Sequence, residues 1–372
     1  MNRRDWLKKG SAVGALTFLG GQGIASTLTE REIREFNPRV LDGPARLNFN
    51  ENPFGPSAKV KAAMTDAFDR GCRYPGSYMN ELVNMIANKE GVSPDHIVLA
   101  GGSTEGLKVT GLTYANNGGE IIAARPTFLA MMTYAKQWGA TVNWVDLDKS
   151  LTHDVDEMER RISSKTKLIF LCNPNNPTST LLEKNRLINF CTSASKKTIV
   201  FSDEAYYDFI EEKDYPSMVS LVKQGENVIV SRTFSKVYGL AGLRVGYLIA
   251  KPEIASKLRE NVVANTNVLA IQAAITAMND NEFYNFSLKK VNEGKALMYK
   301  AFDELNLEYI RSNTNFIFFK TGRPIQTFNQ QMKAEGVLVG RPFPPYEDWC
   351  RVSMGTIEEV QLFNKALKKI FS

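Results

Sequence analysis

The sequence predicts an α/β protein, with a large domain built on a mainly parallel sheet and a smaller α+β domain toward the C-terminus. From residue 94 to residue 250, short apolar runs alternate with segments of helical periodicity, which is typical of βαβ units. Helical patterns then dominate residues 252–305, and short apolar runs alternate with helices again after them. The 372 residues, 43% hydrophobic and 23% charged, are enough for two domains of ordinary size.

The first apolar run of the large domain is 97–100, and a Gly-Gly-Ser-Thr turn separates it from a helix that extends through Tyr114. The same order of apolar run, polar turn and helix recurs along the chain. The further strands predicted here are 120–123, 141–145, 168–171, 198–201, 228–230 and 245–249, with helices at 127–138, 154–162 and 183–194. In the small domain the predicted strands are 316–319, 337–339 and 351–354.

The N-terminus has the features of an export signal. Arg3 and Arg4 precede an aromatic residue, Leu and Lys, residues 10–21 carry no charge, and small residues precede a predicted cleavage after Ala25. This pattern resembles the twin-arginine (Tat) signal, which implies a periplasmic or otherwise exported protein that contacts a membrane only during export. A surface amphipathic helix or an uncleaved anchor is the alternative, and the protein is cytoplasmic if the signal interpretation is wrong.

The predicted domain division is 1–25 for the signal, 26–60 for an N-terminal arm with part of the small domain, 61–260 for the large domain and 261–372 for the small domain. The net charge is +6, and residues 1–25 hold four basic side chains against one acidic, which is half of it. No basic stripe interleaved with aromatic residues occurs in the remainder. We therefore expect no nucleic-acid partner.

Only two histidines are present, His96 and His153, and both are predicted to lie on the surface. A site with three histidine ligands is thereby excluded, and the four cysteines form no C-x-x-C pair. We therefore predict no metal site.

Polar side chains follow four of the predicted strands, where ligands bind in open α/β sheets. Thr233 and Ser235, with Arg244, can form a phosphate-binding cup, and a helix that begins near Ser103 and Thr104 can add its free N–H groups.

Lys236 and Asp203 add the chemistry of an electron-sink cofactor. An amine that is held near cationic groups and partly desolvated has a lowered pKa and can form a Schiff base with an aldehyde, which fits Lys236. Asp203, at the end of a buried strand, can keep a ring nitrogen protonated. With the phosphate cup beside them, these residues point to pyridoxal 5′-phosphate.

At these residues the chain resembles the fold-type I, class I/II aminotransferases, and most of all the histidinol-phosphate aminotransferase group. The resemblance covers residues 47–372 and implies a seven-stranded, mainly parallel sheet. By this resemblance Lys236 binds the cofactor covalently and is the catalytic residue, and Asp203 pairs with the pyridine nitrogen. The other residues implied to bind the cofactor are Tyr206 and Asn176 at its phenolic oxygen, Phe128 stacked on its ring, and Ser103, Thr104, Thr233, Ser235 and Arg244 around its phosphate.

The resemblance also covers the partner subunit and the substrate. Tyr74 matches a tyrosine that reaches the neighbouring subunit's cofactor, which implies a homodimer with shared active sites. Asn52 lies in a segment, 47–56, that resembles the one covering the substrate, and Arg351 matches the arginine that binds the substrate's anionic group. Arg341 matches a second arginine only roughly, because the spacing and the prolines at 342–345 depart from the family pattern.

A further departure is Ser179, where the family usually has glycine; a positive φ there would strain a serine.

The function predicted on these grounds is transamination. An anionic amine or amino acid gives its amino group to a 2-oxo acid by a ping-pong Schiff-base mechanism. Two alternatives remain open from the sequence: a pyridoxal-phosphate-dependent decarboxylase or lyase on the same fold, and a non-catalytic, cofactor-bound periplasmic binding protein.

Overall fold

The structure is a computed structural model, and it describes residues 43–372. The predicted signal at 1–25 and the first part of the arm lie outside the described residues. None of the helices in the described range is both long and apolar enough to cross a bilayer.

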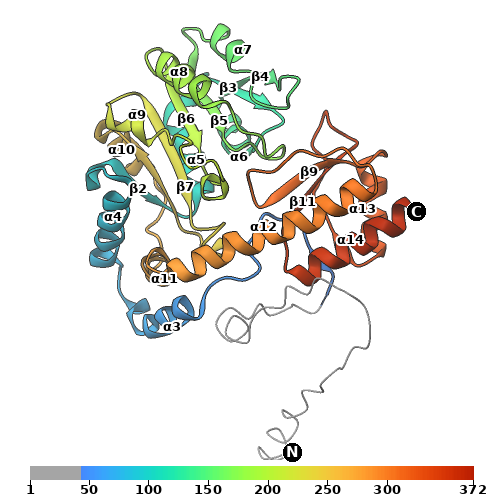
Figure 1. The fold of residues 1–372 in the computed structure, drawn as a ribbon. Helices are drawn as coiled ribbons and strands as arrows, with labels where there is room; N and C mark the ends of the chain where they lie inside the picture. The colour runs from blue at the N-terminus through green and yellow to red at the C-terminus, as the bar shows by residue number, and fades with distance from the viewer. Residues whose placement is uncertain (1–42) are drawn as a thin grey trace, which may run out of the picture.

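A seven-stranded sheet forms the centre of the large part, as predicted (Figure 1). In spatial order its strands are β2 (Ile97–Ala100), β8 (Gly246–Ala250), β7 (Val228–Thr233), β6 (Ile199–Asp203), β5 (Thr166–Cys172), β3 (Glu120–Arg125) and β4 (Thr141–Asp146). Only β8 runs antiparallel to its neighbours. The segment between β7 and β8 holds a short 3₁₀ helix, Ala241–Leu243, and no crossover helix, which a parallel connection usually has.

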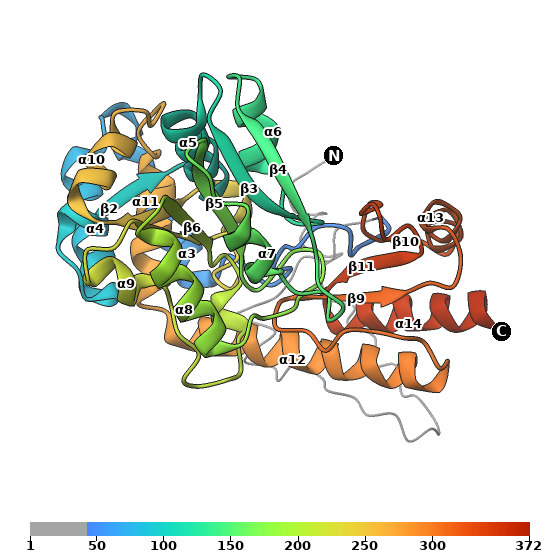
Figure 2. The ribbon, with the colours of Figure 1, turned by 90° about the horizontal axis from the view of Figure 1, so that it is seen from above.

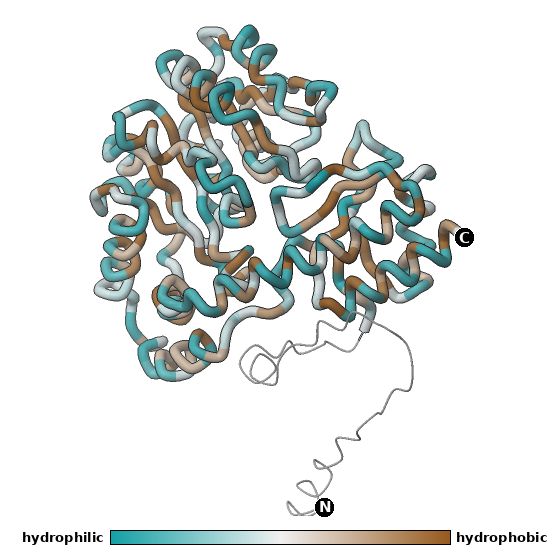
Figure 3. The backbone as a smooth tube through the Cα atoms, viewed as in Figure 1, coloured by the Kyte–Doolittle hydropathy of each residue, from teal (hydrophilic) through white to brown (hydrophobic). Residues whose placement is uncertain are grey.

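Helices cover both faces of this sheet, because successive side chains along each strand point to opposite faces (Figure 2). Leu168 and Phe170 of β5 pack with one set of helices, and Ile169 and Leu171 pack with the other. The first set is α5 (Ser103–Ala115), α6 (Ala130–Lys136) and α10 (Pro252–Arg259), and the second is α4 (Gly76–Glu90), α8 (Lys184–Ser195) and α9 (Val219–Lys223), with α7 (Val155–Arg160) beside α8. Figure 3 shows mostly hydrophobic strands between helices in which hydrophilic and hydrophobic residues alternate.

The smaller part contains two short sheets. β9 (Phe316–Lys320) pairs antiparallel with β11 (Trp349–Ser353), and β1 (Ala45–Arg46) pairs parallel with β10 (Val337–Leu338). These strands pack against α13 (Ile325–Ala334) and α14 (Ile357–Phe371). The N-terminal β1 therefore belongs to the small part.

One long helix joins the two parts. α12 (Asn281–Glu304) has 24 residues, about 36 Å of helix, and runs from the large part to the small sheets (Figure 1). Before it, α11 (Val268–Met278) packs against α3 (Ala58–Asp66) and α4. The division at residues 260 and 261 stays a proposal, and α12 is the element that crosses between the parts.

Candidate active site

A cavity of about 310 Å³ opens at the carboxyl ends of β5, β6 and β7 and at the start of α5. This is the edge of the sheet where ligands were predicted to bind. The predicted site residues that line it are Ser103, Thr104, Phe128, Asn176, Asp203, Tyr206, Ser235, Lys236, Arg244 and Arg351.

Lys236 lines the cavity, and its side chain is held by the segment that contains Asn50. Its Nζ donates a hydrogen bond of 2.6 Å to the carbonyl oxygen of Asn50. Burial, together with the positive charge of Arg351, lowers the pKa of Lys236 to about 8. At pH 7 about a tenth of this amine is therefore neutral and able to accept a proton.

Asn50 is a cavity residue that the sequence analysis did not select. Its side-chain amide donates to the hydroxyl of Tyr206 at 2.8 Å, and its amide oxygen accepts from the hydroxyl of Ser353 at 2.6 Å. The segment 47–56 carries asparagines at 48, 50 and 52, and the pattern alone does not show which of them faces the cavity.

Asp203, the last residue of β6, presents a buried carboxyl group to the cavity. Its carboxylate accepts one weak hydrogen bond, from the backbone N–H of Ala205 at 3.3 Å. Burial raises the pKa of Asp203 to about 7, against the lowering effect of the charge on Lys236. A cationic ligand in the cavity would compensate the buried charge of this carboxylate.

The predicted phosphate cup forms around the start of α5. Gly102 has φ +78°, and a Cβ atom there would collide with the guanidinium of Arg244, so only glycine leaves room for that side chain. Arg244 donates to the hydroxyl of Ser235 at 3.4 Å and to the carbonyl of Ala241 at 2.8 Å. Thr233 lies behind the cup, where its hydroxyl donates to Ser235 at 3.0 Å.

Arg351 enters the cavity from β11, in the small part. It is 9% exposed, and its guanidinium donates to Asn176 Oδ1 at 2.8 Å and to the carbonyl of Asn48 at 2.9 Å. Its Nε has no hydrogen-bond partner within residues 43–372, and no carboxylate in that range forms an ion pair with it. Burial, with a smaller contribution from the charge of nearby Arg341, lowers the pKa of Arg351 to about 10.

Besides Thr233, three of the predicted residues lie outside the cavity. Tyr74 is 93% exposed. The side chain of Asn52 donates to the carbonyl of Val237 at 2.8 Å and to Ser287 at 3.0 Å. Arg341 is exposed, and its guanidinium lies 4.4 Å from the centre of the Phe343 ring, which Arg351 also contacts at 5.1 Å.

Residues 44–367 match the family model described as aminotransferase class I and II. The chain belongs to this family. It is 38% identical over 331 residues to the histidinol-phosphate aminotransferase of Moorella thermoacetica, covering 88% of this chain and 85% of the relative. It is also 36% identical over 328 residues to histidinol-phosphate aminotransferase 1 of Bacillus cereus, with coverages of 87% and 88%.

Solved structures show the same fold. A protein from Erwinia carotovora atroseptica superposes with a TM-score of 0.85 at 32% identity, over 88% of this chain and 96% of that one. The histidinol-phosphate aminotransferase of Sinorhizobium meliloti, solved with pyridoxal 5′-phosphate, gives a TM-score of 0.81 at 24% identity, over 88% and 91%. The protein is thus a histidinol-phosphate aminotransferase-like enzyme, with pyridoxal 5′-phosphate as its cofactor.

The cavity of the aminotransferase fits this cofactor on two observations. The carboxyl group of Asp203 is buried and has no ion-pair partner among the described residues, as a site for a protonated ring nitrogen requires. At the other end, Gly102 leaves the start of α5 open beside Arg244, where a phosphate can bind.

The aminotransferase also buries His153, which was predicted at the surface. The ring is 1% exposed, and its Nε2 lies 2.9 Å from the carbonyl oxygen of Cys172 at the end of β5. Burial lowers the pKa of His153 to about 4, so the ring is neutral at physiological pH. The surface prediction was wrong because this histidine packs under the loop that follows β5.

That loop contains Ser179, which has a left-handed backbone, φ 61°, as the family's usual glycine implies. Its carbonyl accepts two hydrogen bonds from Asn313 of the small part, at 3.3 Å from the backbone and 3.2 Å from the side chain. Its own hydroxyl is buried and has no partner among the described residues. The position therefore combines backbone strain with an unsatisfied polar group.

We expect Ser179→Gly to stabilise the enzyme by about 1 kcal/mol, since the relief of strain and of the buried hydroxyl exceeds the entropy cost of glycine. In thermal unfolding this corresponds to a rise in Tm of roughly 1–2 °C. Ser179→Ala is the matched control, because it removes the hydroxyl and keeps the strained backbone. A Tm of the glycine variant below that of the wild type would contradict this account.

Proposed function

We propose that Lys236 binds the cofactor covalently and transfers the proton during transamination, and that Asp203 pairs with the cofactor's ring nitrogen. When bound, pyridoxal 5′-phosphate supplies the aldehyde that accepts the amino group and the ring that takes up the electron pair. The other residues proposed to hold it are Ser103, Thr104, Ser235 and Arg244, with Thr233 behind them, at the phosphate, Tyr206 and Asn176 at the phenolic oxygen, and Phe128 against the ring.

Lys236 is suited to the proton transfer by its position and its charge state. Its pKa of about 8 leaves part of the amine neutral near neutral pH, so Nζ can take a proton from the substrate's α-carbon and return it elsewhere. The carbonyl of Asn50 orients this amine, and the positive charge of Arg351 discourages its protonation. Asn50 thereby also joins Lys236 to Tyr206.

The observation that carries the substrate proposal is Arg351. A buried guanidinium without a carboxylate partner, with an unpaired Nε, needs an anion, and it faces the same cavity as Lys236. We therefore propose an amino donor with an anionic group, either a phosphate, as in histidinol phosphate, or a carboxylate, with a 2-oxo acid as acceptor. The names of the Moorella and Bacillus relatives support the phosphate compound.

A donor screen tests this proposal. Holoenzyme is mixed with histidinol phosphate, other amino phosphates, aromatic amino acids and matched amines that lack an anionic group. We expect anionic donors to bleach the visible band of the bound cofactor and a 2-oxo acid to restore it. Bleaching by the neutral amines alone would refute the anionic preference, and carbon dioxide release would show a decarboxylation instead.

Replacement of Arg351 should affect anionic donors selectively. Two charge-assisted hydrogen bonds are worth about 1.5–3 kcal/mol each, so Arg351→Met should raise KM for the best anionic donor at least about 100-fold. A neutral amine of equal size should change less than about threefold, and Arg351→Lys should give an intermediate loss. Equal losses for the charged and the neutral donor would mean that Arg351 supports the fold and does not bind the anion.

We also propose a homodimer in which Tyr74 reaches the partner subunit's cofactor phosphate. Its 93% exposure in the single chain leaves its hydroxyl available to another subunit. Light scattering should give twice the monomer mass, and Tyr74→Phe should weaken cofactor binding without changing that mass. A monomer with full activity would refute the proposal.

For its location, we propose export by the twin-arginine route to the periplasm, on the pattern of residues 1–25 alone. Fractionation of cells should find the enzyme outside the cytoplasm, and replacement of Arg3 and Arg4 by lysine should retain it inside. Enzyme that stays cytoplasmic with an intact N-terminus would refute export.

A further inference from the structure

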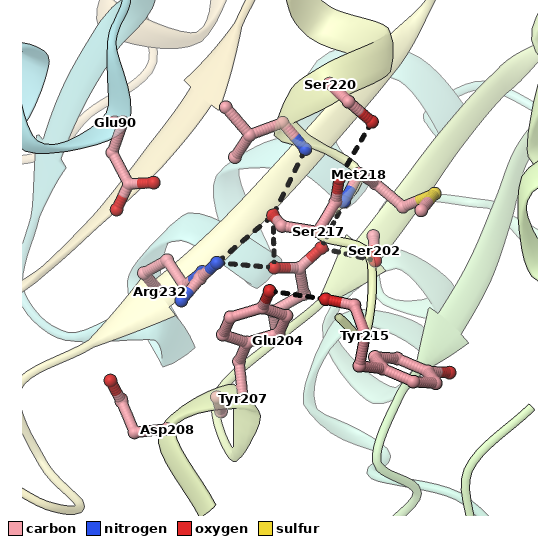
Figure 4. A network of polar contacts seen from close by, with 12 residues as sticks. Glu90, Ser202, Glu204, Tyr207, Asp208, Tyr215, Ser217, Met218, Ser220 and Arg232 are labelled. Atoms are coloured by element: carbon pink, nitrogen blue, oxygen red, sulfur yellow. Dashed lines mark hydrogen bonds and ion pairs between the residues drawn. The ribbon is translucent and has the colours of Figure 1, made fainter. Parts of the chain in front are cut away.

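A buried ion pair lies directly behind the cavity, at the ends of β6 and β7. Glu204 follows Asp203, and Arg232 precedes Thr233, so each charged residue is joined by one peptide bond to a residue at the proposed cofactor site. The side chains face each other, with Arg232 Nη2 and Glu204 Oε2 2.8 Å apart (Figure 4). Both are at most 8% exposed.

The pair is surrounded by groups that fix its geometry. Glu204 also accepts hydrogen bonds from the hydroxyl of Ser217 and the backbone N–H of Met218, both at 2.8 Å. Arg232 donates to the same hydroxyl of Ser217 at 3.1 Å, and its guanidinium stacks 4.1 Å from the centre of the Tyr207 ring. The charges are therefore held by several directional contacts and have little freedom to shift.

The backbone continues this connection. The N–H of Glu204 donates to the carbonyl of Ser231 at 3.0 Å, which extends the pairing of β6 with β7 past the last residue of β6. Asp203 and Ser231 are paired across the two strands. The separation of Asp203 from the segment 233–236 is thus set by this strand pair and by the ion pair behind it.

We propose that Glu204 and Arg232 act as a positioning unit, which holds Asp203 at a fixed separation from the segment of Thr233, Ser235 and Lys236. A cofactor that is bound at both places requires that separation to be constant, since a misplacement of about 1 Å can reduce turnover about 100-fold. This inference rests on the roles proposed above for Asp203 and Lys236. Neither Glu204 nor Arg232 lines the cavity, so they act through their neighbours.

Removal of one charge leaves the other buried and unpaired, which can unfold the protein. The decisive variant is therefore the double one, Glu204→Gln with Arg232→Met, because it removes both charges and should restore a wild-type Tm. We expect its kcat to stay about 10–100-fold below wild type and its affinity for pyridoxal 5′-phosphate to fall about tenfold. The circular dichroism of the bound cofactor in the visible region should change, since this signal reports the orientation of the ring.

Arg232→Lys tests the same idea conservatively. Lysine can keep one contact with Glu204 but not the second with Ser217, so cofactor affinity and kcat should lie between those of the wild type and the double variant. Arg161→Met is the matched control, because Arg161 pairs with Glu157 at 2.6 Å in the same part of the protein, outside the cavity. It should leave cofactor affinity and circular dichroism unchanged.

The positioning role would be overturned if the double variant had the Tm, cofactor affinity, circular dichroism and kcat of the wild type. Glu204 and Arg232 would then form an ion pair without a role in the site. The proposed site roles are tested separately in the wild-type background by Lys236→Ala. If Lys236→Ala kept its activity, the roles proposed for Lys236 and Asp203 would be wrong. If Lys236→Ala is inactive but the double variant behaves like the wild type, only the positioning role of Glu204 and Arg232 is refuted.

Discussion

Lys236→Ala should abolish turnover, with a loss of about 10⁴-fold or more, since the proposed covalent anchor and proton carrier are the same amine. The variant should still fold, because the side chain of Lys236 makes a single hydrogen bond within residues 43–372, with the carbonyl of Asn50. Steady-state transamination and thermal unfolding measured on the same preparation would separate a chemical defect from a folding defect.

Two further measurements make this test specific. Borohydride reduction of wild-type holoenzyme, followed by peptide mass spectrometry, should find the cofactor attached to the peptide that contains Lys236. Lys89→Ala is the control, because Lys89 lies on α4 outside the cavity, bonded to Tyr238 at 2.8 Å. If the cofactor were recovered on another lysine, or if Lys236→Ala retained activity, the proposed mechanism would be wrong.

Asp203→Asn should reduce kcat about 100- to 1,000-fold, the loss typical of removing one preorganised electrostatic contact from an active site. A neutral amide cannot hold a proton on the ring nitrogen as a carboxylate does. Asp146→Asn, on the surface at the end of β4, should be without effect. A variant at position 203 that kept turnover within about threefold of wild type would exclude this role.

Asp203→Asn, which should reduce kcat, should increase the stability of the protein without its cofactor. Burial raises the pKa of Asp203 from 3.8 to about 7, so the folded chain binds more protons than the unfolded chain between these values, and stability falls as pH rises through them. Above pH 7 the cost is on the order of 4 kcal/mol. Cofactor-free Asp203→Asn should therefore be more stable than cofactor-free wild type at pH 8, and this advantage should disappear near pH 4. An advantage that did not depend on pH would contradict the burial of a charged carboxylate.

Much of the fold and the cavity could be predicted from the sequence. Parallel strands bring their carboxyl ends to one edge of the sheet, so the polar segments at Asn176, Asp203 and Lys236, which are 27 and 33 residues apart in the chain, meet there. The strand positions followed from apolar runs that are buried on both faces.

The remaining features depend on packing between distant segments. Asn50 faces the cavity because Ser353, on β11, binds its side chain, and no local pattern encodes that pairing. His153 is buried by the end of β5. Glu204 and Arg232 look like ordinary surface charges in the sequence, since such residues are rarely buried unless they are paired.

One wall of the cavity, formed by Arg351 and Ser353 with Asn48 and Asn50, determines when during synthesis the enzyme can bind its cofactor. Arg351 with Asn48, and Ser353 with Asn50, join residues 303 positions apart in the sequence. Because a polypeptide is made from its N-terminus, a nascent or truncated chain has Lys236 and Asp203 but lacks the wall that orients Asn50. Only a chain synthesised past Ser353 can thus present the whole site to its cofactor, and on the proposed export route the enzyme would bind its cofactor before it leaves the cytoplasm.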